Sequence, residues 1–200
     1  MTDDASPPTP AERLAAIFQG RALTLAVAEG ATGGYLAHLL TQVPGSSSWF
    51  RAGLVTYTDY PKQLLLRVST ETIAERGSIS AETTVQMARL TRRLFGTDWS
   101  IALTGYAGDT APAAGPRAPG VPSINPAGVP RVEAERREPA AGLTYVAMST
   151  AANTAQGDAQ YWEEWELPAP DREGYKRAAA EAAIELLIKL IREQDEAAEG

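Results

Sequence analysis

A serine cluster, a tyrosine and a lysine lie within the twenty residues 43–62 (VPGSSSWFRAGLVTYTDYPK). The chain contains three lysines against fifteen arginines, so arginine is its usual source of positive charge. Arginine cannot give up its proton near neutral pH, whereas a desolvated lysine can. Lys62 is therefore a candidate base, and a nearby serine that it deprotonates is a candidate nucleophile.

Three serines are candidates for that nucleophile, namely Ser46, Ser47 and Ser48. A serine hydroxyl reacts only when a base takes its proton and the developing oxyanion is stabilised. The apolar neighbours of Lys62 can supply a dry setting that lowers its pKa, and Tyr57 can relay or orient the proton. Spacing alone does not choose among the serines. A Pro-Gly turn followed by a solvated lysine fits the same residues.

Composition limits the class of protein. Two hundred residues with 44% hydrophobic and 22% charged content predict one soluble domain with a substantial core. No apolar run approaches the ~20 residues of a membrane span, and the first thirteen residues resemble no signal peptide. We therefore expect a cytoplasmic protein. The net charge of −7 argues against binding to nucleic acid or a membrane surface, but permits a small anion held by a local arginine.

Cysteine and histidine usage removes several mechanisms. The chain has no cysteine, which excludes disulfides, thiolate nucleophiles and cysteine metal sites. Its single histidine, His38, lies in a helical pattern and is interpreted as a packed or half-exposed residue. The chemistry is therefore expected from Ser, Thr, Tyr, Lys, Asp, Glu or Arg.

Alternating strand and helix patterns predict an α/β domain, a three-layer α/β/α sandwich with a mixed, mostly parallel central sheet. The predicted strands are residues 23–28, 50–57, 99–104, 143–149 and 160–167. The predicted helices are residues 10–19, a helix that follows the glycine-rich turn and ends near 41, a short helix from Pro61, and residues 70–76, 81–95 and 172–193. Residues 1–8 are expected to be disordered, and residues 9–195 to form a single domain.

Local signals place the helix starts and one long excursion. Thr9 begins a capping box, Thr32 is a candidate N-cap for the second helix, and Ser80 and Asp171 are predicted to cap later helices. Residues 111–141 contain seven of the fourteen prolines and fit no period. We interpret them as a tolerated insertion, with a lid over the site as the alternative.

Five motifs occur in the order and spacing of a known family: AEGATGG (28–34), VPGSS (43–47), residues 50–62, ISAET (79–83) and LTGYAG (103–108). In these motifs the chain resembles the CinA C-terminal domain family, the nicotinamide-nucleotide amidases or nicotinamide mononucleotide deamidases, over most of residues 10–195. The resemblance implies hydrolysis of the carboxamide of nicotinamide mononucleotide to nicotinate mononucleotide and ammonia, with no metal or organic cofactor. We expect a stand-alone amidase domain that self-associates, as the family does.

The resemblance also implies roles for single residues. Ser47 matches the nucleophile, Tyr57 the proton relay and Lys62 the base. The expected substrate-binding residues are Thr32, Gly33, Gly34, Ser46, Thr104, Gly105 and Arg172. Arg172 would face the anionic part of the substrate. The Thr-Gly-Gly turn can hold a phosphate on free backbone N–H groups, or can simply form a tight βα turn.

Several positions depart from the family pattern. Gly30 and Ala31 replace Ser-Cys, Asp59 replaces asparagine, and Tyr106 and Asp109 alter the motif around Thr104. These changes support two alternatives: a non-catalytic relative that binds a nucleotide or a protein partner, and an amidase for another carboxamide.

The proposed mechanism carries a geometric requirement. Ser47 must lie within hydrogen-bond reach of Lys62, directly or through Tyr57 or one water.

Overall fold

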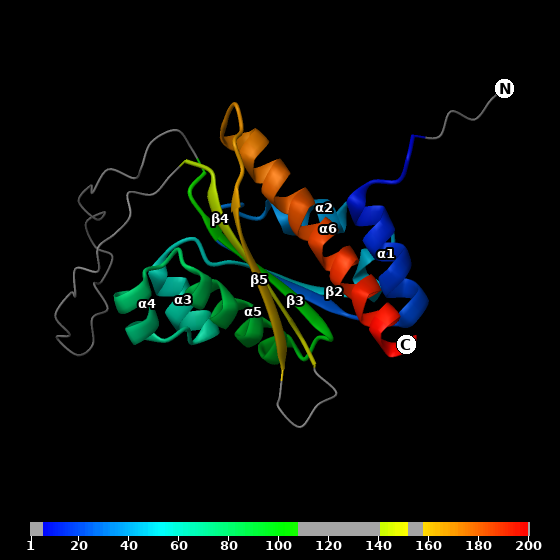
Figure 1. The fold of residues 1–200 in the computed structure, drawn as a ribbon, viewed down its shortest axis with the longest axis horizontal. Helices are drawn as coiled ribbons and strands as arrows, with labels where there is room; N and C mark the ends of the chain where they lie inside the picture. The colour runs from blue at the N-terminus through cyan, green and yellow to red at the C-terminus, as the bar shows by residue number, and fades with distance from the viewer. Residues whose placement is uncertain (1–5, 108–140, 152–157, 200) are drawn as a thin grey trace.

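The computed structural model describes residues 6–107, 141–151 and 158–199. Five strands form one mixed sheet in the order β2-β1-β3-β4-β5, with helices on both faces (Figure 1). The strands are β1 (Leu25–Glu29), β2 (Phe50–Val55), β3 (Trp99–Gly105), β4 (Leu143–Thr150) and β5 (Ala159–Glu166). The helices are α1 (Pro10–Arg21), α2 (Tyr35–Thr41), α3 (Asp59–Leu66), α4 (Thr70–Arg76), α5 (Ala81–Phe95) and α6 (Arg172–Glu199), with a short 3-10 helix η1 (Ser46–Ser48) before β2. The expected α/β sandwich is confirmed.

The central strands explain the buried sequence runs. β1 pairs in parallel with β2 on one side and with β3 on the other, whereas β4 is antiparallel to both β3 and β5. Every residue of β1 is buried, as expected for a parallel strand covered on both faces. β2 and β5 are the sheet edges, and burial alternates along each of them.

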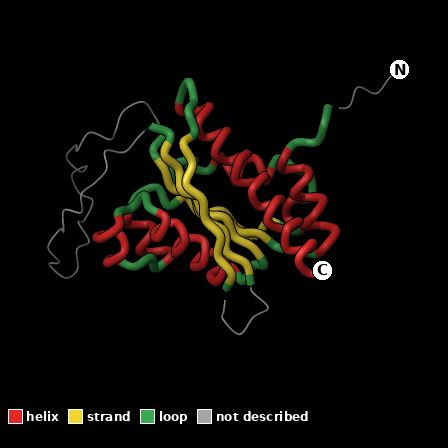
Figure 2. The backbone as a smooth tube through the Cα atoms, in the orientation of Figure 1, coloured by secondary structure: helices red, strands yellow, loops and turns green. Residues whose placement is uncertain are grey.

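Two helical layers enclose this sheet. α1, α2 and α6 pack together on one face, and α5 crosses the other with α3 and α4 beside it (Figure 2). Apolar side chains from α1, α2 and α6 share one core cluster with β1 and β3. A smaller cluster joins α5 to the opposite face of the sheet.

Capping residues fix where the helices start. Thr9 and Glu12 form the predicted capping box, with Thr9 N–H donating to the Glu12 carboxylate at 2.7 Å. Ser80 Oγ accepts from Thr83 N–H at 3.2 Å, so the predicted start of α5 is confirmed. Asp171 Oδ1 accepts from Gly174 N–H at 2.7 Å, as predicted for the start of α6.

The observed boundaries differ from the expected ones by a few residues. α3 begins at Asp59 rather than at Pro61, because proline is tolerated in a first helical turn, where backbone N–H groups lack intrahelical acceptors. α6 continues to Glu199, beyond the expected end near 193. The predicted excursion 111–141 lies outside the described residues, except for its last position.

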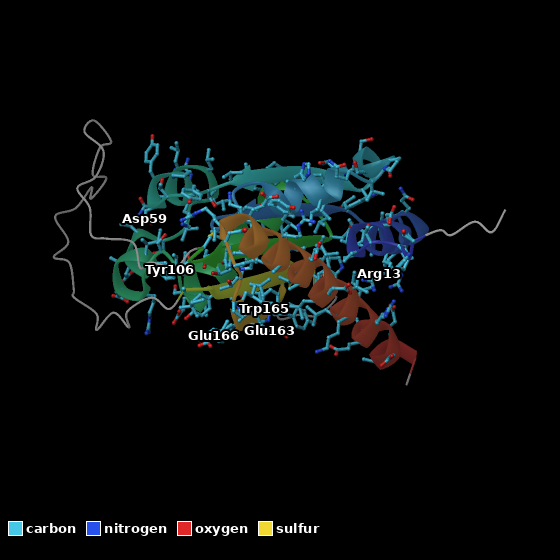
Figure 3. The ribbon with its side chains drawn as sticks, turned by 90° about the horizontal axis from the view of Figure 1, so that it is seen from above. Arg13, Asp59, Tyr106, Glu163, Trp165 and Glu166 are labelled. Atoms are coloured by element: carbon cyan, nitrogen blue, oxygen red, sulfur yellow. The ribbon has the colours of Figure 1, made fainter. Side chains whose placement is uncertain are left out.

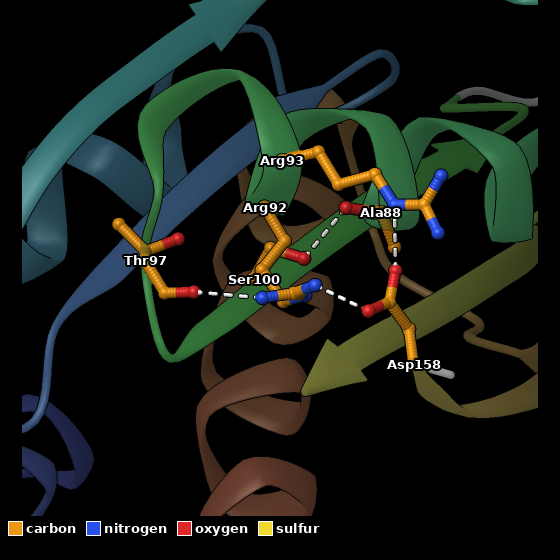
Figure 4. A network of polar contacts seen from close by, with 6 residues as sticks. All are labelled: Ala88, Arg92, Arg93, Thr97, Ser100 and Asp158. Atoms are coloured by element: carbon orange, nitrogen blue, oxygen red, sulfur yellow. Dashed lines mark hydrogen bonds and ion pairs between the residues drawn. The ribbon is translucent and has the colours of Figure 1, made fainter. Parts of the chain in front are cut away.

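A polar network fastens the far end of α5 to the start of β5 (Figure 4). Asp158 forms ion pairs with Arg92 and Arg93, and Ser100 Oγ donates to the Ala88 carbonyl at 2.7 Å. Burial acts to raise the pKa of Asp158, but the two arginines outweigh it and hold that pKa below its ordinary value. This network is structural, because it binds elements together away from the candidate chemistry.

None of the helices in the described ranges is both long enough and apolar enough to cross a lipid bilayer.

Candidate active site at the carboxyl edge of the sheet

The carboxyl ends of β1, β2 and β3 meet at one edge of the sheet, because these strands are parallel. The chain leaves β1 for α2 on one face, and leaves β2 for α3 on the other. In open α/β sheets, ligands bind beside the strand ends at such a switch in direction. The candidate residues of this edge lie at the ends of these three strands and on the helices that begin beside them.

Lys62 is the most unusual side chain at this edge. It lies on α3, is 2% exposed, and donates a hydrogen bond from Nζ to Ser78 Oγ at 2.8 Å. Within the described ranges, no carboxylate forms an ion pair with it. Burial lowers the pKa of the Lys62 amine, and the charge of Asp59 opposes this only in part. A lysine in this state can accept a proton, which a solvated lysine does poorly near neutral pH.

Thr104 belongs to a buried hydroxyl chain at the end of β3. Its Oγ1 lies 2.7 Å from Thr84 Oγ1, which is also 2.7 Å from the Ser80 carbonyl oxygen. A carbonyl only accepts, so Thr84 donates its single hydrogen to Ser80, and Thr104 therefore donates to Thr84. The lone pairs of Thr104 Oγ1 remain able to accept a hydrogen bond from a substrate N–H group.

The glycine-rich turn after β1 is held by a residue that the sequence did not single out. Thr32 does not cap α2, so that prediction is wrong: α2 follows Gly34 and has no side-chain cap of the usual kind. The fully buried carboxylate of Glu29 accepts hydrogen bonds at 2.8–3.0 Å from the backbone N–H groups of Gly34, Leu36 and Ala37. The charge of Glu29 thus occupies the α2 start, where a phosphate could otherwise bind.

A second N–H group of the Thr-Gly-Gly turn is also engaged. Gly33 N–H donates to the Gly30 carbonyl, and both Gly33 and Gly34 have positive φ angles of 61° and 101°. These contacts favour the tight-turn interpretation of Thr-Gly-Gly. Two buried hydroxyls at this edge, Thr32 Oγ1 and Thr56 Oγ1, lack a hydrogen-bond partner among the described residues. They are the groups that a ligand or water can still satisfy.

The first turns of α6 bring two cations to the same edge. Arg172 is exposed, and Lys176 lies one helical turn further on the same face. Lys176 Nζ is 3.5 Å from the position that a Cβ on Gly33 would occupy, so the amine lies over the glycine-rich turn. A bulkier residue at 33 would press against it. These two side chains, rather than backbone N–H groups, can hold an anionic substrate group.

Gly105 and Gly30 are places where other groups approach the backbone closely. A Cβ on Gly105 would collide with the Tyr175 hydroxyl and lie 2.7 Å from the Leu143 carbonyl oxygen. A Cβ on Gly30 would stand 3.6 Å from the Thr104 Cα. The loss of the family's serine at 30 therefore removes a polar side chain from the immediate vicinity of Thr104.

Ser47 lies elsewhere. It is exposed on η1, ahead of β2, where the Trp49 carbonyl accepts from Leu25 N–H at the start of β1. Lys62 lies beyond the other end of β2. Strands rise about 3.3 Å per residue, so the ends of this six-residue strand are on the order of 17 Å apart. One chain therefore does not bring Ser47 and Lys62 within hydrogen-bond reach.

The two ends are distinguishable in Figure 3, where Asp59 and Tyr106 lie at one end of the molecule and Arg13 of α1 at the other. η1 belongs to the α1 end, because a Cβ on Gly45 would meet Gln19 Nε2 at 3.5 Å. Ser46 and Ser47 are therefore separated from the other predicted site residues. Tyr57, which is 56% exposed, lies at the same end of β2 as Lys62.

Sequence reasoning missed three residues of this edge. Ser78 follows the glycine that ends α4 and carried no signal of its own. Glu29 lies in the AEGATGG motif, but the sequence assigned no role to it. Lys176 had a usable signal, because it is one of only three lysines, the same rarity that pointed to Lys62.

Known proteins resemble this chain in sequence. A family model described as the CinA C-terminal domain matches residues 8–136. A CinA-like protein of Synechococcus sp. is 48% identical over 93 residues, and one of Geobacter sulfurreducens is 46% identical over 95 residues. These segments are 46% and 48% of this chain, but only 22% and 23% of the two relatives. The chain thus aligns with less than a quarter of either relative's length.

Solved structures cover nearly the whole chain. The competence/damage inducible protein CihA of Agrobacterium tumefaciens superposes with a TM-score of 0.71 at 28% identity, covering 93% of this chain and 98% of that one. A CinA superfamily protein of Enterobacter cloacae superposes with a TM-score of 0.71 at 25% identity, covering 94% and 98%. The fold is therefore shared with these proteins.

Proposed function

Since the chain belongs to the CinA C-terminal domain family, we propose that it is an amidohydrolase that converts nicotinamide mononucleotide to nicotinate mononucleotide and ammonia. The observation that carries the proposal is Lys62, a lysine that is 2% exposed at the carboxyl edge of the sheet. It has no carboxylate partner in the described part of the chain. A buried lysine without an opposite charge beside it destabilises the fold, and such residues are found at catalytic sites, where a base is needed.

The reaction is an acyl transfer through a covalent intermediate. By the family resemblance, Lys62 takes the hydroxyl proton of Ser47, directly or through Tyr57, and Ser47 Oγ attacks the carboxamide carbon. The two residues lie at opposite ends of β2 in one chain, so this step requires them to be brought together. Backbone N–H groups stabilise the oxyanion. The C–N bond then breaks, and the proton held by Lys62 passes to the leaving nitrogen, which departs as ammonia. Water hydrolyses the acyl-enzyme, leaving the carboxylate and free Ser47.

The remaining edge residues account for substrate binding. The lone pairs of Thr104 Oγ1 can accept from the carboxamide N–H, since its hydrogen is donated to Thr84. Arg172 and Lys176 can hold the phosphate, because both lie in the first turns of α6 and Lys176 Nζ lies over the glycine-rich turn. Gly30 and Asp59 depart from the family pattern near these binding residues, and we propose that they influence which carboxamide substrate is preferred.

Ammonia release from a substrate panel tests the proposal. We expect turnover of nicotinamide mononucleotide, weaker turnover of phosphate-free nicotinamide riboside, and none of glutamine. Ser47→Ala should abolish the rate, while Ser48→Ala, the neighbouring serine of η1, should retain it. Failure to release ammonia from any nicotinamide nucleotide would refute the activity.

A second candidate function is a binding role without turnover. Gly30 beside Thr104 and the separation of Ser47 from Lys62 within one chain favour it. Titration calorimetry distinguishes the two, because tight binding of nicotinamide mononucleotide without ammonia release supports the binding role.

A further inference from the structure

We propose that Tyr175 is a positioning residue that fixes the spacing between the cations of α6 and Thr104, and thereby sets how well the phosphate of the substrate is recognised. The roles of Thr104 and of the cations Arg172 and Lys176 rest on the proposed function. The placement of Tyr175 rests on its burial, its hydrogen bond and its close approach to Gly105, none of which the mechanism uses.

Tyr175 is a polar aromatic side chain enclosed by the fold. It is 2% exposed and belongs to a small cluster of buried residues with Ala31, Ala107 and Ala179. Ala31 lies in the turn after β1, and Ala107 lies just after β3. Small side chains at these two positions leave room for the phenol ring, which packs α6 against two loops of the carboxyl edge.

The hydroxyl of Tyr175 acts as a hydrogen-bond donor. It lies 2.7 Å from Thr144 Oγ1, which also lies 3.0 Å from the Gly142 carbonyl oxygen. A carbonyl oxygen only accepts, so Thr144 donates its single hydrogen to Gly142 and accepts the hydrogen of Tyr175. Burial raises the pKa of the Tyr175 hydroxyl above its ordinary value of 10.0, so this donor keeps its hydrogen at neutral pH.

The same hydroxyl lies against the backbone beside Thr104. Thr144 of β4 is paired with Gly105, the last residue of β3. The Tyr175 oxygen occupies the space that a Cβ on Gly105 would need. Gly105 directly follows Thr104 in the chain, so the Tyr175 hydroxyl joins the start of α6 to the strand end that carries Thr104.

The first turns of α6 carry the other half of this arrangement. Arg172 precedes Tyr175 by three positions, and Lys176 follows it directly. All three residues lie on one short stretch of a regular helix, so a shift at Tyr175 moves both cations with it. The Tyr175 hydroxyl therefore sets the distance between the groups proposed to hold the phosphate and the carboxamide. A displacement of roughly 1 Å is enough to weaken such a site.

Steady-state kinetics of Tyr175→Phe on two substrates test the inference. The variant should raise KM for nicotinamide mononucleotide by roughly fivefold, as expected for the loss of one neutral hydrogen bond, and leave kcat near the wild-type value. KM for nicotinamide riboside, which has no phosphate, should stay near the wild-type value. A merely structural role would reduce the folded fraction, which would lower kcat for both substrates alike and leave both KM values unchanged.

Tyr161→Phe is the matched control. The Tyr161 hydroxyl accepts from Gln194 Nε2 at 3.1 Å, so it joins β5 to α6 near the opposite end of that helix from Arg172. This variant also removes a tyrosine hydroxyl that contacts α6. It should leave the ratio of the two KM values as it is in the wild type.

Substitutions of Thr144 test the hydrogen bond from its other side. Thr144→Ser keeps the acceptor hydroxyl and should keep the wild-type ratio of KM values. Thr144→Val removes the acceptor and should raise KM for nicotinamide mononucleotide as Tyr175→Phe does. The double variant Tyr175→Phe/Thr144→Val should be no more impaired than either single variant, because both remove the same contact.

The outcomes separate this inference from the proposed function. Turnover with an unchanged KM for nicotinamide mononucleotide in a folded Tyr175→Phe variant, or an equal rise for both substrates, would overturn the inference alone. If the wild type releases no ammonia, the amidase activity fails, and titration calorimetry with the same two compounds replaces KM by Kd. The phosphate-dependent loss in Tyr175→Phe is then still expected. A wild type that binds neither compound would overturn both proposals.

Discussion

Lys62 Nζ donates to Ser78 Oγ at 2.8 Å, so the buried lysine has a serine partner within its own chain. That serine is not the one that the family resemblance selects. Ser78 lies between α4 and α5, whereas Ser47 lies on η1 beyond the opposite end of β2. The contact holds the amine in place at the carboxyl edge of the sheet.

This relationship makes Ser78 a positioning residue. Ser78→Ala should lower the rate of ammonia release by roughly tenfold, the equivalent of one hydrogen bond of about 1.4 kcal/mol. Ser47→Ala should lower it by a thousandfold or more, roughly as expected for loss of a nucleophile. Ser78→Thr keeps the hydroxyl and should restore most of the rate. Steady-state kinetics of the three variants would contradict this ranking if Ser78→Ala were the most impaired.

The buried amine also affects stability. The pKa of Lys62 is lowered by burial from 10.5, so between its folded pKa and 10.5 the unfolded state binds more protons. The free energy of unfolding therefore rises with pH through that window, and below it the buried ammonium destabilises the fold. Lys62→Met should raise the free energy of unfolding at pH 7 and remove this rise.

Urea denaturation at pH 7 and pH 9 measures the effect. Lys189→Met is the matched control, because the Lys189 side chain is 63% exposed. The control should keep the wild-type dependence on pH. An unchanged pH dependence in Lys62→Met would show that the amine has the same proton affinity in both states.

Glu29 should be a structural residue. Its buried carboxylate accepts hydrogen bonds from three backbone N–H groups at the start of α2. Glu29→Gln replaces one of the two acceptor oxygens with an NH₂ group. The substitution should reduce the free energy of unfolding by about 1–3 kcal/mol, because a buried donor is left without an acceptor. Chemical denaturation measures the loss, with exposed Glu164→Gln expected to lie within about 0.5 kcal/mol of the wild type.

Lys176 should select for the phosphate. Lys176→Ala should raise KM for nicotinamide mononucleotide by roughly tenfold or more, since a charge-assisted hydrogen bond is worth about 1.5–3 kcal/mol. Kinetics with nicotinamide riboside, which lacks the phosphate, should be unchanged. Arg177→Ala is the control, because the Arg177 side chain is 58% exposed and pairs with Glu173. Equal losses on both substrates would show that Lys176 does not contact the phosphate.

The fold could be predicted because each element has clear local boundaries. Thr9, Ser80 and Asp171 cap helices as expected, and the buried runs of β1 and β3 lie at the centre of the sheet. The cap of α2 could not be predicted in the same way. Glu29 reaches that helix from the end of a strand, and a search for a serine, threonine, aspartate or asparagine at the helix start instead selected Thr32.

The site could be predicted only in part. Lys62 was found from its rarity and its motif, and the structure places it in a buried position at the carboxyl edge. Contacts between distant segments left no such signal, which is why Ser78 was missed. Nearness in sequence did not translate into nearness in space for Ser47. Fifteen positions separate it from Lys62, but β2 lies between them and carries the chain from one end of the sheet to the other.

The most direct test of the proposed role of Lys62 is the rate of ammonia release from nicotinamide mononucleotide by the wild type and by Lys62→Arg. Arginine keeps the positive charge and most of the side-chain length but cannot act as a base. We predict turnover by the wild type and a loss of roughly a hundredfold or more in Lys62→Arg, with both proteins folded by circular dichroism. A Lys62→Arg variant that releases ammonia at the wild-type rate would contradict the proposed role of Lys62.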